Sequence, residues 1–346
     1  MKILIIIFFI PRLAWCLDLK ISGTLDAVYS QGLNQSSTAS EKLNMRGTEI
    51  SVFSPIDHTF NGLISFAAHD ESGAQNFELH EGVISSSKLI KNTNIRLGKF
   101  FLGVGRLNRF HQHDWYFTTA PKIHRELFDT EGALDTGIES TTLLPFESIW
   151  NVTMGVTSGH TWGHSHVAGV KPKTPTHYSR IARYFEYDTE LGAELGANYI
   201  GRTSYNNEQK KMYGLDFILK AKKGKTITHL VQSEFWFREE KNLVSEKTVG
   251  SYIYYQKSVT DDSPFFIGLR WDTYKLLDRK NILGEKENNI QHTFTLPVTY
   301  QHSEFSFFRL SFSHDFTRIE GDTKNRDQRL EAQIIYIIGE HPAHVF

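Results

Sequence analysis

The stretch that decides the fold is GKFFLGVGRLNRFHQHDWYFTTAPKIHRELFDTEGALDTGIESTTLLP, residues 98–145. A strand-like segment enters it and ends near Val104, and another leaves it from about Asp135. The segment between them, Gly105–Leu134, is too long for a turn and lacks helical periodicity. Connections of about 4–6 residues are usual, and much longer ones are mostly functional or disordered. Since this one is rich in aromatic and apolar residues, we expect an ordered loop that packs into or over the rest of the protein.

Apolar residues alternate with polar residues or glycine on both sides of this loop. In one example Tyr213, Leu215 and Phe217 lie on one face of an extended segment, and Gly214 and Asp216 lie on the other. Such a period of two indicates β-strands. The pattern predicts about sixteen strands of about ten to twelve residues, with fourteen or eighteen left open, and we find no convincing helix.

The lengths of the strands and of their connections favour a membrane barrel over a soluble sandwich. Soluble strands average about five or six residues, whereas tilted transmembrane strands need about nine to eleven. Connections after even-numbered strands are tight, as at 222–225, and those after odd-numbered strands are longer, as at 30–42 and 277–289. We therefore predict an all-β, transmembrane, antiparallel up-and-down β-barrel with short periplasmic turns, long outer loops and the loop Gly105–Leu134 folded inward.

The two faces of the expected strands fit this interpretation. The apolar face suits lipid on the outside, and the face with Arg, Asp, Glu, Thr and Gly suits a wet lumen. Aromatic residues near strand ends are expected in the interfacial girdles: Tyr199, Trp236, Phe237, Tyr254, Tyr255, Tyr300 and Phe316.

Composition narrows the classes of function. The formal net charge of the 346 residues is −1, so no field-driven attraction to nucleic acid is implied. Mean hydropathy is −0.36. No run of eighteen apolar residues follows residue 16, which excludes spanning helices in the mature chain.

The N-terminus reads as an export signal. Lys2, the apolar run 3–10 and small residues at Ala14 and Cys16 predict a signal peptide over residues 1–16, cut before Leu17. Residues 17–346 then form a single outer-membrane barrel domain. An alternative is acylation of Cys16, the only cysteine, as in a lipoprotein.

The last residue, Phe346, has the same strand parity as Ile334, Tyr336 and Ile338. A terminal aromatic in this position is expected to be the handle for the barrel-assembly machinery.

The inward-folded loop is expected to form the pore constriction. Charges that face one another across a pore select ions. The residues that we expect there are Arg106, Arg109, His111, His113, Asp114, Trp115, His124, Arg125 and Glu131. His111 and His113 would project to one side of an extended segment, close enough to share a metal ion with a carboxylate. Packing against Phe110 and Trp115 is the alternative, and His124 is expected to be structural.

Histidine is frequent, with 16 residues, and a second cluster follows Gly159. We expect His160, His164, His166 and His177 to form a weak, outward-facing site for Zn²⁺ or another divalent metal, since imidazole suits zinc, copper and nickel. The alternative is that they are ordinary polar loop residues, and no cofactor is required. The scattered histidines are expected at the girdles or in the lumen: His58, His69, His80, His229, His292 and His314.

The sequence carries no GxSxG, HExxH or Gly-rich phosphate motif. We therefore expect a protein that is not an enzyme, although an outer-membrane enzyme with a buried Ser–His or carboxylate pair stays open.

Several segments resemble a family of Gram-negative outer-membrane porin-like proteins, which are related to phosphate-selective-porin-like barrels. Some of its members are labelled zinc-regulated outer-membrane receptors. The resemblance rests on residues 97–101, 105–108, His111, His113, Trp115, Phe117, Pro121, Phe128, 131–132, 135–137, 143–145 and the tail His341–Phe346. It implies a passive or gated pore rather than an energy-coupled transporter, because the chain has no room for 22 strands and a plug domain.

The expected function is a porin-like channel for small solutes, with divalent metal ions such as zinc as the favoured specific solute. The alternative from another class is a non-conducting structural or adhesive barrel. The expected partners are outer-membrane lipid, small solutes or ions, and two further copies in a homotrimer, with no nucleic acid.

Overall fold

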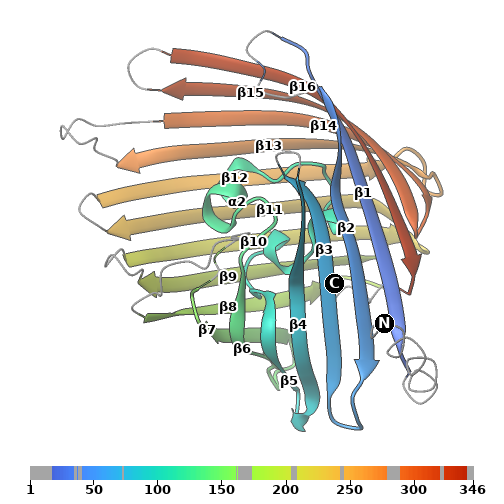
Figure 1. Cartoon of the computed structure of the whole chain (residues 1–346), viewed down its shortest axis with the longest axis vertical. Coiled ribbons are helices and arrows are strands. Elements are labelled where there is room, and N and C mark those ends of the chain that lie inside the picture. Colours follow the sequence, from blue (N-terminus) through green and yellow to red (C-terminus); the bar gives the residue numbers. More distant parts are fainter. Residues whose placement is uncertain are drawn as a thin grey trace, which may run out of the picture.

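The chain folds into a closed β-barrel in a computed structural model that describes residues 18–34, 37, 41–71, 74–160, 162, 174–203, 209–241, 245–278, 289–319 and 323–340 (Figure 1). The predicted signal peptide with Cys16, the histidines His164 and His166, and Phe346 lie outside these residues. Among the described residues, no helix is long and apolar enough to cross a membrane.

The described residues form sixteen strands, as the alternation predicts. The first eight are β1 (Lys20–Gly32), β2 (Lys42–Pro55), β3 (Asn61–Glu71), β4 (Ala74–Ile90), β5 (Thr93–Phe101), β6 (Leu134–Leu143), β7 (Ile149–Thr157) and β8 (Thr174–Glu186). The others are β9 (Leu191–Thr203), β10 (Gln209–Lys223), β11 (Thr226–Lys241), β12 (Ser245–Ser258), β13 (Phe265–Asp278), β14 (Asn289–Ser303), β15 (Ser306–Ile319) and β16 (Thr323–Gly339).

Every strand pairs antiparallel with its neighbours in sequence, and β1 pairs with β16 to close the ring. The closing register runs from Ser22 opposite Gly339 to Gly32 opposite Arg329. Because the sheet closes, its backbone donors and acceptors have partners all around, which is the condition for strands to cross a bilayer. The expected fold class is confirmed, although β1 begins at Lys20 rather than at Leu17.

The barrel is apolar outside and polar inside. On β10 the exposed fraction of Leu215 is 53%, whereas that of Asp216, the next residue, is 2%. Two of the expected girdle residues break this pattern. Trp236 and Tyr254 are 1% exposed and point inward, because each packs against the loop that fills the lumen. The girdle prediction is therefore wrong for these two residues.

The loop between β5 and β6 runs into the barrel. It contains the short 3-10 helices η1 (Leu107–Arg109) and η2 (Gln112–Asp114) and the helix α2 (Lys122–Phe128). Figure 1 shows α2 inside the ring of strands, and its contacts are with β12 and β13. The prediction of an inward-folded loop is confirmed. The expectation of no helix is wrong for α2, since its seven residues, about two turns, are too few to show a clear period in the sequence.

The expected alternation in length holds only in part. The turn between β10 and β11 lies between Lys223 and Thr226, whereas the connection between β5 and β6 lies between Phe101 and Leu134. The connections after β3 and β15 run only from Glu71 to Ala74 and from Ile319 to Thr323, so the expectation of longer connections after odd-numbered strands is wrong for these two. By the usual asymmetry of such barrels, the end with the short turns is periplasmic and the end with the long connections is outer.

Candidate functional site

The neck of the loop is closed by hydrogen bonds between its two ends. The amide of Leu102 donates to the carbonyl of Ala133 at 3.0 Å. The buried Asn108 side chain donates to Leu102 O at 2.8 Å and accepts from the amide of Ala133 at 2.6 Å. At Gly132, where φ is +125°, a Cβ would lie 2.8 Å from Asn108 Oδ1. The loop therefore leaves the strands through a tight neck that requires glycine at this position.

Acceptors on the wall hold the backbone of the first half of the loop. Glu139 on β6 accepts from the amide of Gly103, and Glu234 on β11 accepts from that of Leu107, each at 2.8 Å. Asn198 on β9 accepts from the amide of Gly105 at 2.8 Å. These amides have no helix or sheet partner, so the wall side chains satisfy them in a buried setting.

Donors on the wall hold the second half. Arg309 on β15 donates to the carbonyl of Trp115 at 3.0 Å, and Tyr254 on β12 donates to that of Tyr116 at 3.2 Å. Arg46 and Arg270 donate to the loop carbonyls of residues 118 and 119. Because charged donors make the stronger hydrogen bonds, this half of the loop is fixed in register across the lumen.

Apolar packing seats the loop on the wall formed by β9–β13. Ile123 of α2 lies over Gly250 of β12, where an added Cβ would come within 2.7 Å of the Ile123 Cβ. Phe128 meets Trp236 edge to face, with ring centroids 4.9 Å apart. Phe117 contacts Tyr254 in the same manner at 5.4 Å. The loop is therefore built into the core of the lumen rather than laid over it.

His124 belongs to this apolar seat. Its ring lies 5.2 Å from that of Trp115 and 5.3 Å from that of Phe128. Burial lowers the pKa of His124 to about 3, so the ring is neutral at physiological pH. The expected structural role of His124 agrees with this position. Its neighbour Trp115 is itself held in place, because the indole N–H donates to Leu107 O and Phe110 O.

The predicted arginines Arg106 and Arg109 lie on the opposite side of the loop from His111. Arg109 Nη1 is 3.4 Å and Arg106 Nη1 is 3.9 Å from Glu194 Oε1 on β9. Glu194 and Asp216 both also pair with Arg180 of β8, each at 2.6 Å. Burial and the nearby Arg180 lower the pKa of Arg109 to about 10, which leaves it charged at neutral pH.

Arg125 lies near a different part of the wall. Burial and the charge of Arg329 lower its pKa, and Asp315 acts in the opposite direction.

The predicted residues His111, His113 and Glu131 come together with three residues of the wall. We call this group, with Glu49 on β2 and His80 and Glu81 on β4, the histidine–carboxylate cluster. His111 Nδ1 is 3.0 Å from Glu49 Oε2, and its Nε2 is 3.0 Å from Glu81 Oε2. Burial disfavours the charge on His111, but Glu49 and Glu81 outweigh it and raise the pKa of His111 well above its usual value.

His80 extends the cluster. Its Nδ1 is 3.5 Å from Glu49 Oε2 and its Nε2 is 3.5 Å from Glu131 Oε2. The rings of His111 and His113 stack at 5.3 Å, and His113 Nε2 is 3.6 Å from Asp114 Oδ2. The expectation that His111 and His113 share one side with a carboxylate agrees with this geometry, and that carboxylate is Glu49.

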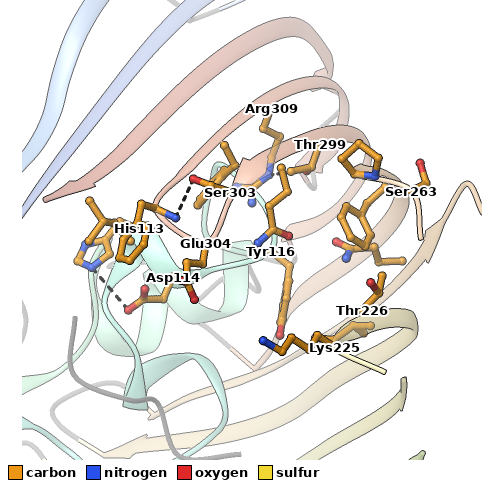
Figure 2. Close-up of a pocket in the computed structure, with 18 of the residues that line it drawn as sticks. His113, Asp114, Tyr116, Lys225, Thr226, Ser263, Thr299, Ser303, Glu304 and Arg309 are labelled. Atoms are coloured by element: carbon orange, nitrogen blue, oxygen red, sulfur yellow. Dashed lines mark hydrogen bonds and ion pairs between the residues drawn. The ribbon is translucent and has the colours of Figure 1, made fainter. Parts of the chain in front are cut away.

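Two cavities meet the loop. A vestibule of about 860 Å³ at the short-turn end is lined by loop residues 113–116 and by the turns after β10, β12 and β14. Figure 2 shows His113, Asp114 and Tyr116 on one side of it and Thr226 and Ser263 on the other. A second cavity, of about 30 Å³, lies inside the histidine–carboxylate cluster. His113 lines both cavities, so it stands where the vestibule meets the cluster.

The second set of predicted histidines is only partly described. His160 is exposed just after β7. His177 lies on β8, on the same face as the outward-pointing Ile181, with its ring 5.7 Å from that of Tyr199. The idea that His177 belongs to the outer loop is therefore wrong. The metal site proposed for His160, His164 and His166 stays a prediction.

Sequence reasoning missed Glu49, Glu81 and the role of His80, which it assigned to a girdle or to the lumen in general. Strand parity could have found the inward direction of Glu49, since it alternates with the outward Ile50. It could not have found that of both His80 and Glu81, which are adjacent on β4 at a β-bulge and are both buried. No sequence signal could have shown that residues about 30 to 60 positions before the loop would meet its histidines.

No protein-family model matches the chain. An uncharacterized protein of Aquifex aeolicus (strain VF5) is 22% identical over 98% of this chain and 80% of the relative. Solved structures share the architecture at low identity. The outer-membrane channel DcaP of Acinetobacter baumannii has a TM-score of 0.64 at 10% identity, over 93% of this chain and 97% of its own.

An anion-selective porin from Comamonas acidovorans has a TM-score of 0.63 at 11% identity, over 93% of this chain and all of its own. The outer-membrane protein OmpT of Vibrio cholerae, solved in a trimer form, has a TM-score of 0.62 at 9% identity, over 93% and 99% of the two chains. The architecture and these porin-like neighbours make the chain an outer-membrane β-barrel.

Proposed function

We propose that this barrel is an outer-membrane channel for small solutes, whose inward-folded loop narrows the lumen and selects by size and charge. The observation that carries the proposal is the vestibule of about 860 Å³ that enters from the short-turn end and stops at loop residues 113–116. The loop is held by side chains of the wall on several sides, as a selecting constriction requires. Passage then depends on the space and charge beside His113.

The charges around the narrow cavity favour cations. Its lining includes the carboxylates of Asp26, Glu49 and Glu131, with Arg46 paired to Asp26. Rings of carboxylates select cations in pores. Divalent metal ions are the specific solutes that we favour, because histidines lie among these carboxylates. Kinship with phosphate-selective-porin-like barrels would imply the opposite preference, for anions.

The test is single-channel recording of the refolded protein in a planar bilayer with a KCl gradient. We expect discrete open steps and a reversal potential whose sign indicates cation selectivity. Glu131→Gln should move this reversal potential toward zero. Lys223→Gln, on an exposed turn and paired with Asp261, is the control and should leave the reversal potential unchanged. A reversal potential of the sign for anions would refute the charge selection, and the absence of steps would refute the channel.

The second candidate is a non-conducting structural barrel, and the packed lumen favours it. Phe117, Ile123 and Phe128 of the loop are fully buried against the wall. The same recording separates the two candidates, since a structural barrel gives no steps at any voltage.

The oligomeric state is proposed to be a homotrimer, on the analogy of the trimer form of the Vibrio cholerae protein. Light scattering of the detergent-solubilised protein measures it, and a protein mass of one chain would contradict it.

A further inference from the structure

The histidine–carboxylate cluster encloses a space of the size of one small ion or one water molecule. The cavity of about 30 Å³ lies among Glu49, His80, His111, His113 and Glu131. A site needs about 10–15 Å³ and two to four polar partners to hold a single water. The space is therefore large enough for a single occupant, and six carboxylate or imidazole side chains that can ligate a cation line it, together with the guanidinium of Arg46.

Three of these groups have the spacing of a metal site. Glu49, His111 and His113 each offer one ligand atom, and the three atoms lie within 4.8 Å of one another. Ligand atoms around tetrahedral zinc are about 3.3 Å apart, because each bond is about 2.0–2.1 Å long. His111 Nδ1 lies 3.0 Å from Glu49 Oε2, and the ion would replace the proton between these two atoms, because imidazole ligates a metal only when it is neutral. Movement of the ligand atoms by up to about 1.5 Å would bring the set to tetrahedral spacing.

Neighbouring groups orient these ligands as they do in metal sites. Ser51 and Ser65 donate to Glu49 Oε1 at 2.9 and 2.7 Å, which directs Oε2 toward His111. His111 presents its other nitrogen, Nε2, to Glu81 at 3.0 Å. A carboxylate on the far nitrogen fixes the tautomer and orientation of a metal-ligating histidine. Asp114 stands in the same relation to His113, at 3.6 Å from Nε2.

The local charge also favours a cation. Glu49, Glu81 and Glu131 bring three carboxylates to the cluster, and Glu78 Oε1 is 3.4 Å from His80 Nε2. Nitrogen donors disfavour Mg²⁺ and Ca²⁺, which take oxygen ligands, and favour zinc and its neighbours.

We propose that Glu49, His111 and His113 form a binding site for one divalent transition-metal ion, with Zn²⁺ as the best fit, and that the ion fastens the loop to the wall at β2. The ligands come from two elements: Glu49 from the wall, and the two histidines from the loop on either side of Gln112. The fourth position faces the cavity, where a water or a passing solute completes the coordination. Apolar packing holds the loop on β9–β13, so the metal would fasten the loop on the opposite side of the lumen. The metal-site proposal does not depend on whether the barrel conducts.

The first experiment measures zinc binding to the folded full-length barrel in detergent after removal of metal with EDTA. Titration with ZnSO₄ against a chromophoric zinc indicator gives stoichiometry and affinity. We expect one site per chain, which is lost in His111→Ala/His113→Ala. Glu81→Gln, which removes only the orienting carboxylate, is expected to lower the affinity about 10- to 100-fold.

Two controls assign the site. Replacement of His160, His164 and His166 by alanine removes the outer-loop histidines and should leave the affinity unchanged. His229→Ala removes a histidine whose Nδ1 is 2.9 Å from the hydroxyl of Tyr255, outside the cluster, and should also have no effect. Loss of zinc in the outer-loop variant with retention in His111→Ala/His113→Ala would overturn the proposal, as would the absence of a site in the unmodified protein.

A second measurement needs no variant. Co²⁺ bound to the unmodified protein should give the intense d–d absorption of a four-coordinate site with nitrogen and oxygen ligands. Zn²⁺ should also slow hydrogen exchange of the loop amides at 107–117. Weak octahedral absorption, or exchange that does not respond to zinc, would refute a metal that fastens the loop.

Discussion

Acid should loosen the inward-folded loop through a single buried histidine, His124. The side chain is 2% exposed, and neither ring nitrogen has a hydrogen-bond partner among the described residues. Burial lowers its pKa to about 3. When the loop detaches, the ring enters water and its pKa returns to about 6.5. Between these two values, the detached loop binds a proton that the packed loop does not.

The sign and size of the effect follow from this difference. Since the detached state binds more protons, the stability of the packed loop falls as the pH is lowered from 6.5 toward 3. Each unit is about 1.4 kcal/mol, so at pH 5 the loop loses about 2 kcal/mol, a factor of about 30 in its opening equilibrium. His111 acts in the opposite direction once the comparison extends above pH 6.5. Its raised pKa adds stability that is complete below pH 6.5 and is lost as the pH rises through the folded-state pKa.

Hydrogen exchange of loop peptides, followed by mass spectrometry at pH 7.5 and pH 5 and corrected for intrinsic rates, measures the opening. Because the opposite contribution of His111 is common to both proteins, we expect the ratio of opening at pH 5 to opening at pH 7.5 to be about 30-fold larger in the unmodified protein than in His124→Leu. His229→Leu is the matched control and should behave like the unmodified protein. If His124→Leu shows the same pH dependence of opening as the unmodified protein, the reasoning about His124 is wrong.

Three further changes test the seat, the neck and the exterior. Gly250→Leu should push Ile123 off β12 and speed loop exchange, with overpacking worth about 1–3 kcal/mol; unchanged exchange would contradict the seat. Asn108→Ala should cost about 1–3 kcal/mol in loop stability, measured by proteolysis of the loop, because the buried amide of Ala133 loses its acceptor and the carbonyl of Leu102 loses a donor. Ile253→Lys, on the exposed face of β12, should lower folding stability in lipid by about 2–4 kcal/mol but change little in detergent, and equal loss in both would refute a lipid contact.

The barrel itself could be predicted from local patterns. The parity of residues such as Leu215 and Asp216 follows from the period of two along each strand, and closure follows because a membrane tolerates no open sheet edge. The inward loop also left a local signal, since residues 98–145 combine length with apolar content. The seven-residue α2 left none, because its formation depends on the Gly250 and Trp236 surfaces that receive it.

The sequence by itself thus determined a β-barrel of about sixteen strands, its apolar exterior, and the loop that carries His111 and His113. Only the tertiary structure decided what those histidines meet. Closing the ring brings β2 and β4 beside the loop, so that Glu49 lies 3.0 Å from His111. The tertiary structure also set Phe128 of the loop against Trp236 inside the lumen, where a strand-end aromatic had suggested a girdle. The physical reason is that side-chain direction is a local property of a strand, whereas contact across a lumen depends on which strands the closed sheet sets opposite one another.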